Sequence, residues 1–303
     1  MRKNLFVAMT LATLLSGHAT AVAEDLTGTL KKVKELGYIT LGHREASVPF
    51  SYIDDKQQPV GFAMDICAKI VDAVKRELNL DKIEVKYTPV TASTRIPLLA
   101  NGTIDLECGN TTNNAERQRQ VWYTNTHFLT ASRYLSKVES NIGAIGDLKG
   151  KTVVSAAGST NIKQALEFNA ALKLEMTIIP AKDHGEAFLM VETGRAVAYI
   201  MDDIVLAGLI AISRDPKAYV ISKDAFSAEE PYGIMLRKDD AAFKTIVDTA
   251  TATLYESPEG AALYAKWFTQ PIPPKGVNLN IPMSPAIKRA FEKPTDSPDP
   301  TAY

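Results

Sequence analysis

The chain has 303 residues, of which 46% are hydrophobic and 23% are charged. Its 34 basic and 35 acidic residues give a formal net charge of −1. This length suits two lobes better than one core, and the absence of a basic stripe argues against nucleic acid as a partner.

The first 23 residues have the pattern of a secretory signal peptide. Arg2 and Lys3 form a basic start, residues 5–15 an apolar run, and residues 21–23 an A-x-A cleavage signal before Glu24. The run is too short to span a bilayer, and no later stretch is long and uncharged enough. No Cys follows the cleavage point to carry a lipid. We therefore predict an exported, soluble chain with a net charge of −3 after loss of the two leader cations.

The first half of the mature chain alternates between helical and strand patterns. The expected elements are a helix at 29–35, a strand at 38–41, a turn-rich connection at 51–59, a helix at 62–78, a strand at 83–87, a short helix at 96–100 and a strand at 103–106. This β-α-β-α-β order predicts an α/β lobe with mostly parallel strands.

A similar order then recurs. We expect a strand at 152–155, a polar loop at 156–161 followed by a helix, a strand at 176–179, a helix at 186–192 and a strand at 195–201. A pattern of helix, Gly, strand and polar loop occurs at 98–110 and again at 189–203, which indicates two lobes built alike.

The last part of the chain is too small to fold alone. It contains a strand at 231–236, helices at 240–255 and 261–268, and a Pro-rich tail after Gln270 that we expect to wrap the surface. We expect this part to return to the first lobe. The predicted division is a signal peptide (1–23), the first part of lobe 1 (24–130), lobe 2 (131–226), and the return to lobe 1 with the tail (227–303).

Residues 107–117 are the most informative stretch for function. We predict a loop of small polar side chains that enters a helix near Ala115, with Asn113 or Asn114 as its cap. The backbone N–H groups beyond the cap, the Thr hydroxyls and Arg117 would together bind a small anion, most naturally a carboxylate.

Polar side chains fall at equivalent strand ends, where ligands bind in open parallel sheets. They are Arg44, Arg95, Thr112, Arg117, Ser159, Thr160, His184 and Asp202. Three Arg, a His, hydroxyls and a carboxylate suit a molecule with two negative groups and one positive group, such as an acidic amino acid. Taken singly, each has a plainer interpretation: a surface Arg, a turn, a helix start at His184, or a helix cap at Asp202-Asp203.

The two cysteines lie in the same predicted lobe. Cys67 shares an apolar helical stripe and Cys108 ends a strand, and an exported compartment permits a disulfide between them. We favour the bridge over two buried thiols. Two Cys without clustered His or Asp ligands make a poor zinc site, so we expect no metal and no cofactor.

No hydrolase, zinc-protease or phosphate-loop motif is present. His184 with Glu107 or Asp202 could still perform acid–base work, such as dehydration of an acidic substrate. A dehydratase therefore remains an alternative to a binding protein.

Several motifs resemble the periplasmic glutamate/aspartate-binding proteins of ABC transporters, in order and over nearly the whole mature chain. They are Gly42-His43-Arg44-Glu45, Ser47-Val48-Pro49-Phe50-Ser51-Tyr52, Arg95-Ile96-Pro97-Leu98-Leu99, Glu107-Cys108-Gly109, Thr112-Asn113-Asn114, Lys182-Asp183-His184-Gly185, Gly194-Arg195-Ala196-Val197-Ala198, Met201-Asp202-Asp203, Leu236-Arg237-Lys238-Asp239-Asp240 and Pro271-Ile272-Pro273-Pro274-Lys275.

The resemblance implies the type II periplasmic binding protein fold, with two α/β lobes joined by hinge strands near 128–135 and 226–235. It implies a periplasmic, non-enzymatic protein, which we expect to be a monomer, that captures glutamate or aspartate and delivers it to an inner-membrane ABC permease. The ligand-capturing module of a sensor is a further alternative, although the chain has no transmembrane segment or output domain of its own.

The resemblance also implies roles for single residues. The residues that would hold the ligand carboxylates are Arg44, Arg95, Thr112, Arg117, Thr160 and His184, and Asp202 would take the ammonium group. Arg117 would hold the α-carboxylate, while Arg44, Arg95 and His184 suit the side-chain carboxylate. Relatives commonly carry Ser where this chain has Ala92 and Asn110, which leaves the preference between glutamate and aspartate open and makes Asn110 the position expected to tune it.

Overall fold

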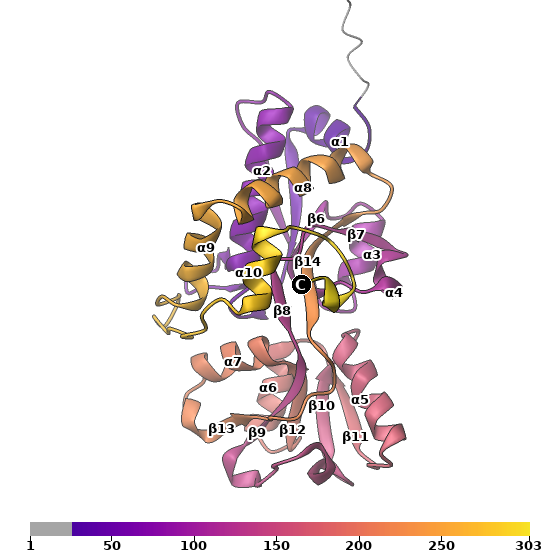
Figure 1. Ribbon diagram of the computed structural model, residues 1–303, viewed down its shortest axis with the longest axis vertical. Coiled ribbons are helices and arrows are strands. Elements are labelled where there is room, and N and C mark those ends of the chain that lie inside the picture. Colours follow the sequence, from indigo (N-terminus) through magenta and orange to yellow (C-terminus); the bar gives the residue numbers. More distant parts are fainter. Residues whose placement is uncertain (1–25) are drawn as a thin grey trace, which may run out of the picture.

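The computed structural model describes residues 26–303, so the predicted signal peptide and its cleavage after Ala23 lie outside the described residues. The chain forms two lobes that follow one another along the longest axis of the molecule (Figure 1). Each lobe has its own sheet with helices packed against it.

The first lobe is built on a sheet with the strand order β5-β1-β6-β14-β7. The parallel strands are β1 (Tyr38–His43), β5 (Glu84–Pro89) and β6 (Leu106–Thr112); β14 (Glu230–Arg237) pairs antiparallel with β6 and with β7 (Val121–Tyr123). The helices of this lobe are α1 (Gly28–Leu36), α2 (Phe62–Glu77), α3 (Arg95–Ala100), α4 (Ala115–Gln118), α8 (Ala241–Tyr255), α9 (Pro258–Phe268) and α10 (Pro285–Glu292).

The second lobe is built on a sheet with the order β11-β10-β12-β9-β13. Its parallel strands are β10 (Thr152–Ala156), β11 (Thr177–Ala181) and β12 (Ala198–Asp202); β9 (Ser132–Lys137) pairs antiparallel with β12 and with β13 (Tyr219–Ile221). The α-helices are α5 (Thr160–Ala171), α6 (His184–Glu192) and α7 (Asp203–Ile212).

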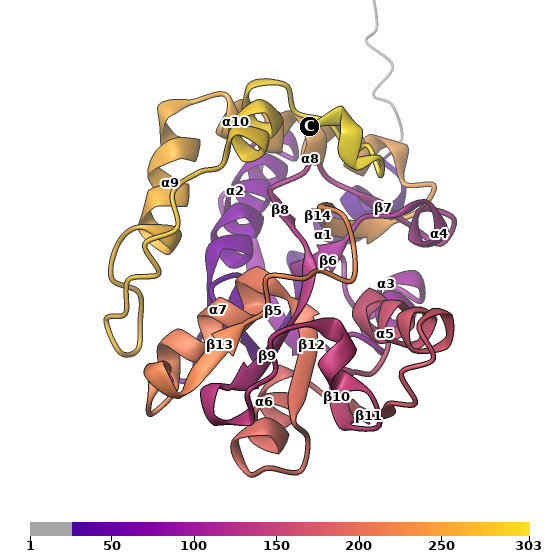
Figure 2. The ribbon, with the colours of Figure 1, turned by 60° about the horizontal axis from the view of Figure 1, so that its bottom comes forward.

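The chain crosses between the lobes twice. It leaves the first lobe where β8 (Phe128–Thr130) leads into β9, and it returns through β14. β8 and β14 pair antiparallel, with Phe128 opposite Tyr232, and they lie side by side in both views (Figures 1 and 2). The two connections therefore form a short two-stranded ribbon between the lobes.

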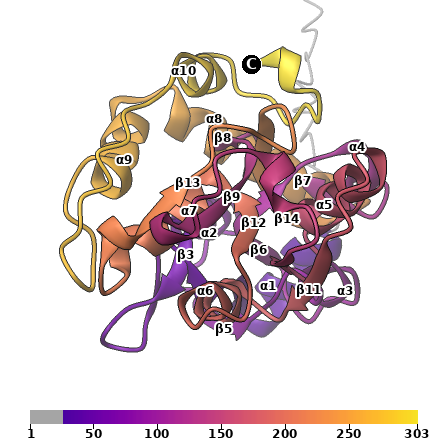
Figure 3. The ribbon, with the colours of Figure 1, turned by 90° about the horizontal axis from the view of Figure 1, so that it is seen from below.

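A small third sheet replaces part of the turn-rich connection expected at 51–59. Its strands are β2 (Ala46–Ser47), β3 (Ser51–Ile53) and β4 (Pro59–Val60). It belongs to the first lobe in sequence, and β2 contacts α6 and α7 of the second lobe. Seen from below, β3 is visible between α7 and α6 (Figure 3).

The loop predicted at 107–112 is wrong, because these residues form strand β6. β6 pairs with β1 on one side and β14 on the other, with Cys108 opposite His43 and Thr112 opposite Tyr232. The polar side chains indicated a loop because central strands usually read as apolar runs. Here every residue of the strand is buried, and some of its polar side chains pair with other segments, as Asn110 does with Arg44.

The predicted disulfide is present. Cys67 of α2 and Cys108 of β6 are joined at an S–S distance of 2.07 Å, and both are fully buried. The bridge links the helix that covers the first sheet to its central strand β6.

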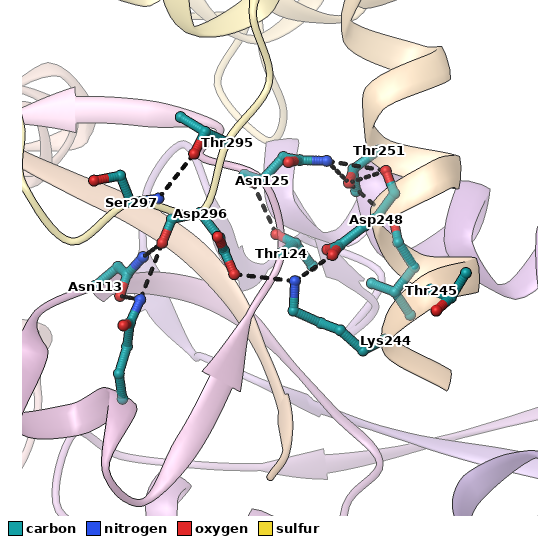
Figure 4. Close-up of polar contacts among 12 residues, drawn as sticks. Asn113, Thr124, Asn125, Lys244, Thr245, Asp248, Thr251, Thr295, Asp296 and Ser297 are labelled. Atoms are coloured by element: carbon teal, nitrogen blue, oxygen red, sulfur yellow. Dashed lines mark hydrogen bonds and ion pairs between the residues drawn. The ribbon is translucent and has the colours of Figure 1, made fainter. Parts of the chain in front are cut away.

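The Pro-rich tail lies on the outside of the first lobe, as predicted, but it also adds to the core. Phe291 of α10 stacks on Tyr255 of α8 at a ring distance of 4.6 Å. Further along, the Asp296 carbonyl accepts a hydrogen bond from Asn113 Nδ2 at 2.8 Å, and Lys244 lies between the carboxylates of Asp248 and Asp296 (Figure 4). The last residues are thus fixed by polar contacts as well as by packing.

Candidate ligand-binding site

A small cavity of about 10 Å³, room for about one water molecule, lies between the two lobes at the carboxyl ends of their parallel strands. Its lining residues are Arg44, Ala92, Arg95, Asn110, Thr112, Ser159, Thr160, Asn161, His184, Met201 and Asp202. All the predicted site residues except Arg117 are among them. A larger hollow of about 360 Å³ opens on the first lobe beside α2 and β5, where the predicted residues do not gather.

Arg44 follows β1 and is held by two cavity residues from different lobes. Its Nη1 donates to Asn110 Oδ1 at 3.2 Å, and its Nη2 lies 3.4 Å from His184 Nε2. Because a guanidinium only donates, the amide oxygen of Asn110 must face it. The amide nitrogen, Nδ2, is buried and has no hydrogen-bond partner among residues 26–303. It is a donor free to meet an acceptor in the cavity.

Arg95 begins α3 and is tied to a buried polar group behind the cavity. Its Nη1 donates to Thr111 Oγ1, which donates in turn to Glu107 Oε2 at 2.7 Å. Burial and then the neighbouring Arg117 lower the pKa of Arg95 to about 9, and it remains charged at neutral pH. Its Nε also lacks a partner within the described part of the chain.

Arg117 does not line the cavity. Its Nη1 donates to the Thr112 carbonyl at 2.9 Å and its Nη2 to the Gly158 carbonyl of the second lobe at 3.3 Å. The helix that carries it, α4, has four residues, and the Arg117 N–H is bonded to the cap residue Asn114 at 2.9 Å. The predicted cap by Asn114 is thus present and takes up the Arg117 N–H, while an anion site at the start of α4 stays a prediction.

The second lobe contributes three consecutive residues at the start of α5. Ser159 caps the helix: its hydroxyl accepts from the Ile162 N–H at 3.2 Å and donates to the Ala156 carbonyl at 2.7 Å. Thr160 Oγ1 lies 3.4 Å from Thr112 Oγ1 of the first lobe. The hydroxyl of Ser159 is therefore occupied within the protein, whereas the two threonines face each other across the cleft.

His184 is the first residue of α6, capped by Asp183, and is 1% exposed. The donor-only guanidinium of Arg44 requires an unprotonated Nε2, so the ring proton is on Nδ1, 2.6 Å from the Tyr199 hydroxyl. Burial, then Arg44 and Arg95, hold the pKa of His184 well below its usual value. A neutral His184 orients Arg44 in this arrangement.

Asp202 stands at the N-cap position of α7 but makes no side-chain capping bond, so its plainer interpretation as a helix cap is wrong. Its Oδ1 accepts from Asn161 Nδ2 at 2.6 Å, and its Oδ2 accepts from the Tyr232 hydroxyl. Burial raises the pKa of this carboxyl group despite both bonds, as expected for a carboxylate without a close cation. The remaining amide oxygen of Asn161 is buried and unpaired in the described chain.

Sequence reasoning missed Asn161, Met201 and Tyr232. Asn161 had a usable signal, since it directly follows Thr160 in the polar stretch at a predicted strand end. Tyr232 had none, because it comes from the returning strand β14 and meets Asp202 only through the fold.

The acid–base pairs suggested by the sequence do not form in this structure. The hydrogen bonds of His184 go to Arg44 and Tyr199 rather than to Glu107 or Asp202. Over residues 26–303 no cluster of three or more His, Cys, Asp and Glu is placed to hold a metal ion. In the same range, no helix is both long and apolar enough to cross a membrane.

Two α/β lobes with a charged cavity between their strand ends define a two-lobed binding protein. The chain belongs to family 3 of the bacterial extracellular solute-binding proteins, whose profile matches residues 39–270. Crystal structures with this architecture include a mutant of ArgBP from T. maritima, with 25% identity and a TM-score of 0.69 over 79% of this chain and 99% of that one. The predicted type II periplasmic binding fold is thus confirmed.

Curated relatives agree with this family. The chain is 52% identical to the L-glutamate/L-aspartate-binding protein of Pseudomonas aeruginosa, over 97% of this chain and 96% of the relative. It is 43% identical to the glutamate/aspartate import solute-binding protein of Escherichia coli K12, over 98% of both chains. An ancestral amino acid-binding protein described as a precursor of cyclohexadienyl dehydratase is 27% identical, with a TM-score of 0.69 over 80% of this chain and all of that one.

Proposed function

We propose that this protein captures glutamate or aspartate between its lobes and delivers it to an inner-membrane ABC permease. The observation that carries the proposal is the charge of the cavity. Arg44 and Arg95 are cationic and His184 is neutral, so the lining presents two positive charges together with the carboxyl group of Asp202, whose pKa is raised by burial. An amino acid with two carboxylates and one ammonium has one net negative charge and complements it.

The unpaired polar atoms supply a placement for the ligand. Arg44, Arg95 and Asn110 Nδ2 are donors of the first lobe and would take the side-chain carboxylate. Asp202 and Asn161 Oδ1 are acceptors of the second lobe and would take the ammonium group.

The α-carboxylate would bind between the hydroxyls of Thr112 and Thr160, with Arg117 turning from the Gly158 carbonyl to meet it. His184 orients Arg44 toward the ligand. Ser159, the N-cap residue of α5, lines the cavity. Ionic hydrogen bonds of this kind contribute roughly 1.5–3 kcal/mol each.

The units that close over the ligand are, in our proposal, the segments 24–130 with 227–303 and the segment 131–226. A ligand that bonds to Arg44 on one unit and Asp202 on the other stabilises the closed arrangement over an open one. We further propose that the protein works as a monomer in the periplasm. The family, and the import function printed for the Escherichia coli relative, support this setting.

A thermal-shift panel of Glu, Asp, Gln, Asn, Arg and Leu tests the ligand class. A ligand at 100 times its Kd adds roughly 2.7 kcal/mol of stability, which gives a clear rise in Tm. We expect a rise with Glu or Asp, a much smaller one with the amides and none with Arg. A response to neutral or basic amino acids, with none to Glu or Asp, would refute the proposal.

Two arginine variants test the placement by calorimetry. Arg95→Ala removes a donor to the side-chain carboxylate and should weaken Glu by roughly 10- to 100-fold while leaving weak Gln binding nearly unchanged. Arg117→Ala should abolish binding of every amino acid. The exposed neighbour Arg119→Ala is the matched control and should bind like the wild type. Equal losses of Glu and Gln in Arg95→Ala would contradict its role.

A further inference from the structure

The surfaces on which the lobes meet include two glycines of the second lobe that face the backbone of the first lobe. Gly208 lies within α7, and Gly158 lies in the turn between β10 and α5. Neither lines the cavity. At both positions a side-chain carbon would collide with main-chain atoms of the other lobe.

Gly208 is the tighter contact. A Cβ at this position would stand 2.3 Å from the Val48 carbonyl oxygen and 2.9 Å from its carbonyl carbon. Carbon and carbonyl oxygen normally approach to no less than about 3.3 Å, so the two lobes would have to separate by about 1 Å here. Val48 is 1% exposed and is followed by the turn into β3, so its main chain has no free space to move into.

Gly158 makes the second contact, on the side of the cleft formed by α3 and α5. A Cβ here would stand 2.8 Å from Ser93 Cα and 2.9 Å from Ser93 N. Two hydrogen bonds join the lobes at this contact: Ser93 Oγ donates to the Ala157 carbonyl at 2.9 Å, and Arg117 donates to the Gly158 carbonyl. The positive φ of +79° at Gly158 adds a local preference for glycine.

Other glycines of the second lobe provide a contrast. Gly185 of α6 also faces the first lobe, but its Cβ would meet Ala46 Cβ at 3.7 Å, an ordinary contact distance. Gly194 shares the positive φ of Gly158, at +76°, and a Cβ there would meet nothing within 4 Å. Glycine is therefore required for contact between the lobes at only some of these positions.

We propose that Gly208 and Gly158 are positioning residues that set how far the cleft closes, and that tight ligand capture requires both. A separation of about 1 Å would break cross-cleft pairs such as Thr112–Thr160, since hydrogen bonds weaken steeply beyond their usual length. It would equally lengthen the bonds from a ligand to Asp202 while those to Arg44 stayed in place. The proposal rests on capture between the lobes, the proposed function, and adds the residues that limit closure.

Gly208→Ala gives the sharper test, because alanine is the better helix former in α7. We expect the ligand-free variant to unfold at the same or a higher Tm. We expect its Kd for glutamate to rise at least about tenfold, the loss of one ionic hydrogen bond, mainly through a faster koff in stopped-flow measurements. Small-angle scattering should show less compaction at saturating glutamate than in the wild type. Gly185→Ala is the matched helical control and should keep wild-type Kd.

Gly158→Ala is compared with Gly194→Ala, which carries the same backbone strain in open space. Both should lower the Tm of the ligand-free protein, but only Gly158→Ala should weaken glutamate binding, again by about tenfold or more. Unchanged Kd in both Gly208→Ala and Gly158→Ala would overturn the proposal. So would a fall in ligand-free Tm of Gly208→Ala with unchanged Kd, because the contact would then support folding rather than closure.

Ligand binding by the wild-type protein distinguishes failure of this proposal from failure of the proposed function. If wild-type protein binds neither glutamate nor aspartate, the ligand assignment fails. The four glycine variants are then measured with whichever of the twenty amino acids raises the wild-type Tm. An affinity loss confined to Gly208→Ala and Gly158→Ala would still support the closure contacts.

Discussion

His127 shows how a single side chain makes stability depend on pH. It is fully buried against Phe50, Phe62 and Tyr232, with ring centroids 5.9, 6.0 and 6.1 Å away. Neither ring nitrogen has a hydrogen-bond partner in the described chain, and burial lowers the pKa of His127 to about 3. In the unfolded chain this histidine is protonated below about pH 6.5, whereas in the folded protein it stays neutral until much lower pH. This group therefore favours folding above pH 6.5, and its contribution falls as the pH drops toward 3.

We expect His127→Phe to reduce this dependence. Between pH 7 and pH 5, the unfolding free energy of the wild type should fall by about 2 kcal/mol more than that of the variant. Urea unfolding at both pH values measures the difference. An equal loss in the two proteins would show that His127 is not buried in its neutral form.

At the scale of elements, the disulfide fixes the position of a strand that supplies site residues. Cys108 lies in β6 two residues before Asn110 and four before Thr112, and the bridge ties this strand to α2. The bridge closes a loop with a sequence separation of 41 residues. In the chain-entropy model, closing such a loop raises the free energy of the unfolded state by about 4 kcal/mol.

We predict that Cys67→Ala/Cys108→Ala lowers the unfolding free energy by roughly 2–4 kcal/mol at pH 7. Wild-type protein unfolded in denaturant with a reductant present should show a similar loss, while reductant should leave the variant unchanged. Thiol titration of unfolded, unreduced wild type gives an independent check: two reactive thiols would contradict the bridge.

At the same scale, strongly periodic segments could be predicted and polar strands could not. The helices predicted at 62–78 and 240–255 match α2 and α8 to within one residue, because each buries one apolar face. Strand β6 was predicted to be a loop because partners of its polar side chains, such as Arg44 for Asn110, come from other segments of the chain. The tail likewise gave no sign that Phe291 would stack on Tyr255.

At the scale of the whole molecule, Glu230 is an ionisable residue at the junction of the two lobes. It begins β14, where the chain returns to the first lobe, and its Oε1 accepts a hydrogen bond at 2.9 Å from Gln164 of α5 in the second lobe. Burial and then the charge of Asp202 raise the pKa of Glu230 to about 7, against the attraction of Arg117. The folded protein thus holds this proton more tightly than the unfolded chain. The contribution of Glu230 to the unfolding free energy is fully present below pH 4.5 and is lost as the pH rises through 7.

We therefore expect the unfolding free energy of the wild type to fall by roughly 1–2 kcal/mol between pH 5 and pH 8 through the ionisation of Glu230. Glu230→Gln keeps an acceptor for Gln164 and should not show this fall. Urea unfolding at the two pH values checks this. Glu229→Gln, at the exposed neighbouring position, is the control and should behave like the wild type. The same alkaline loss in Glu230→Gln and the wild type would exclude Glu230 as its source.

The alternation of helices and strands, the family, the disulfide partners and the types of residue at the strand ends could all be predicted from the amino-acid sequence. These depend on local periodicity and on motifs, which are legible along one chain. The hydrogen-bond partner of each polar group, in contrast, could be identified only in the folded protein. Arg117 reaches the carbonyl of Gly158, and Asp202 is held by Asn161 and Tyr232. Such choices depend on distances between segments that only the packing of two lobes brings together, and the same packing requires glycine at Gly208.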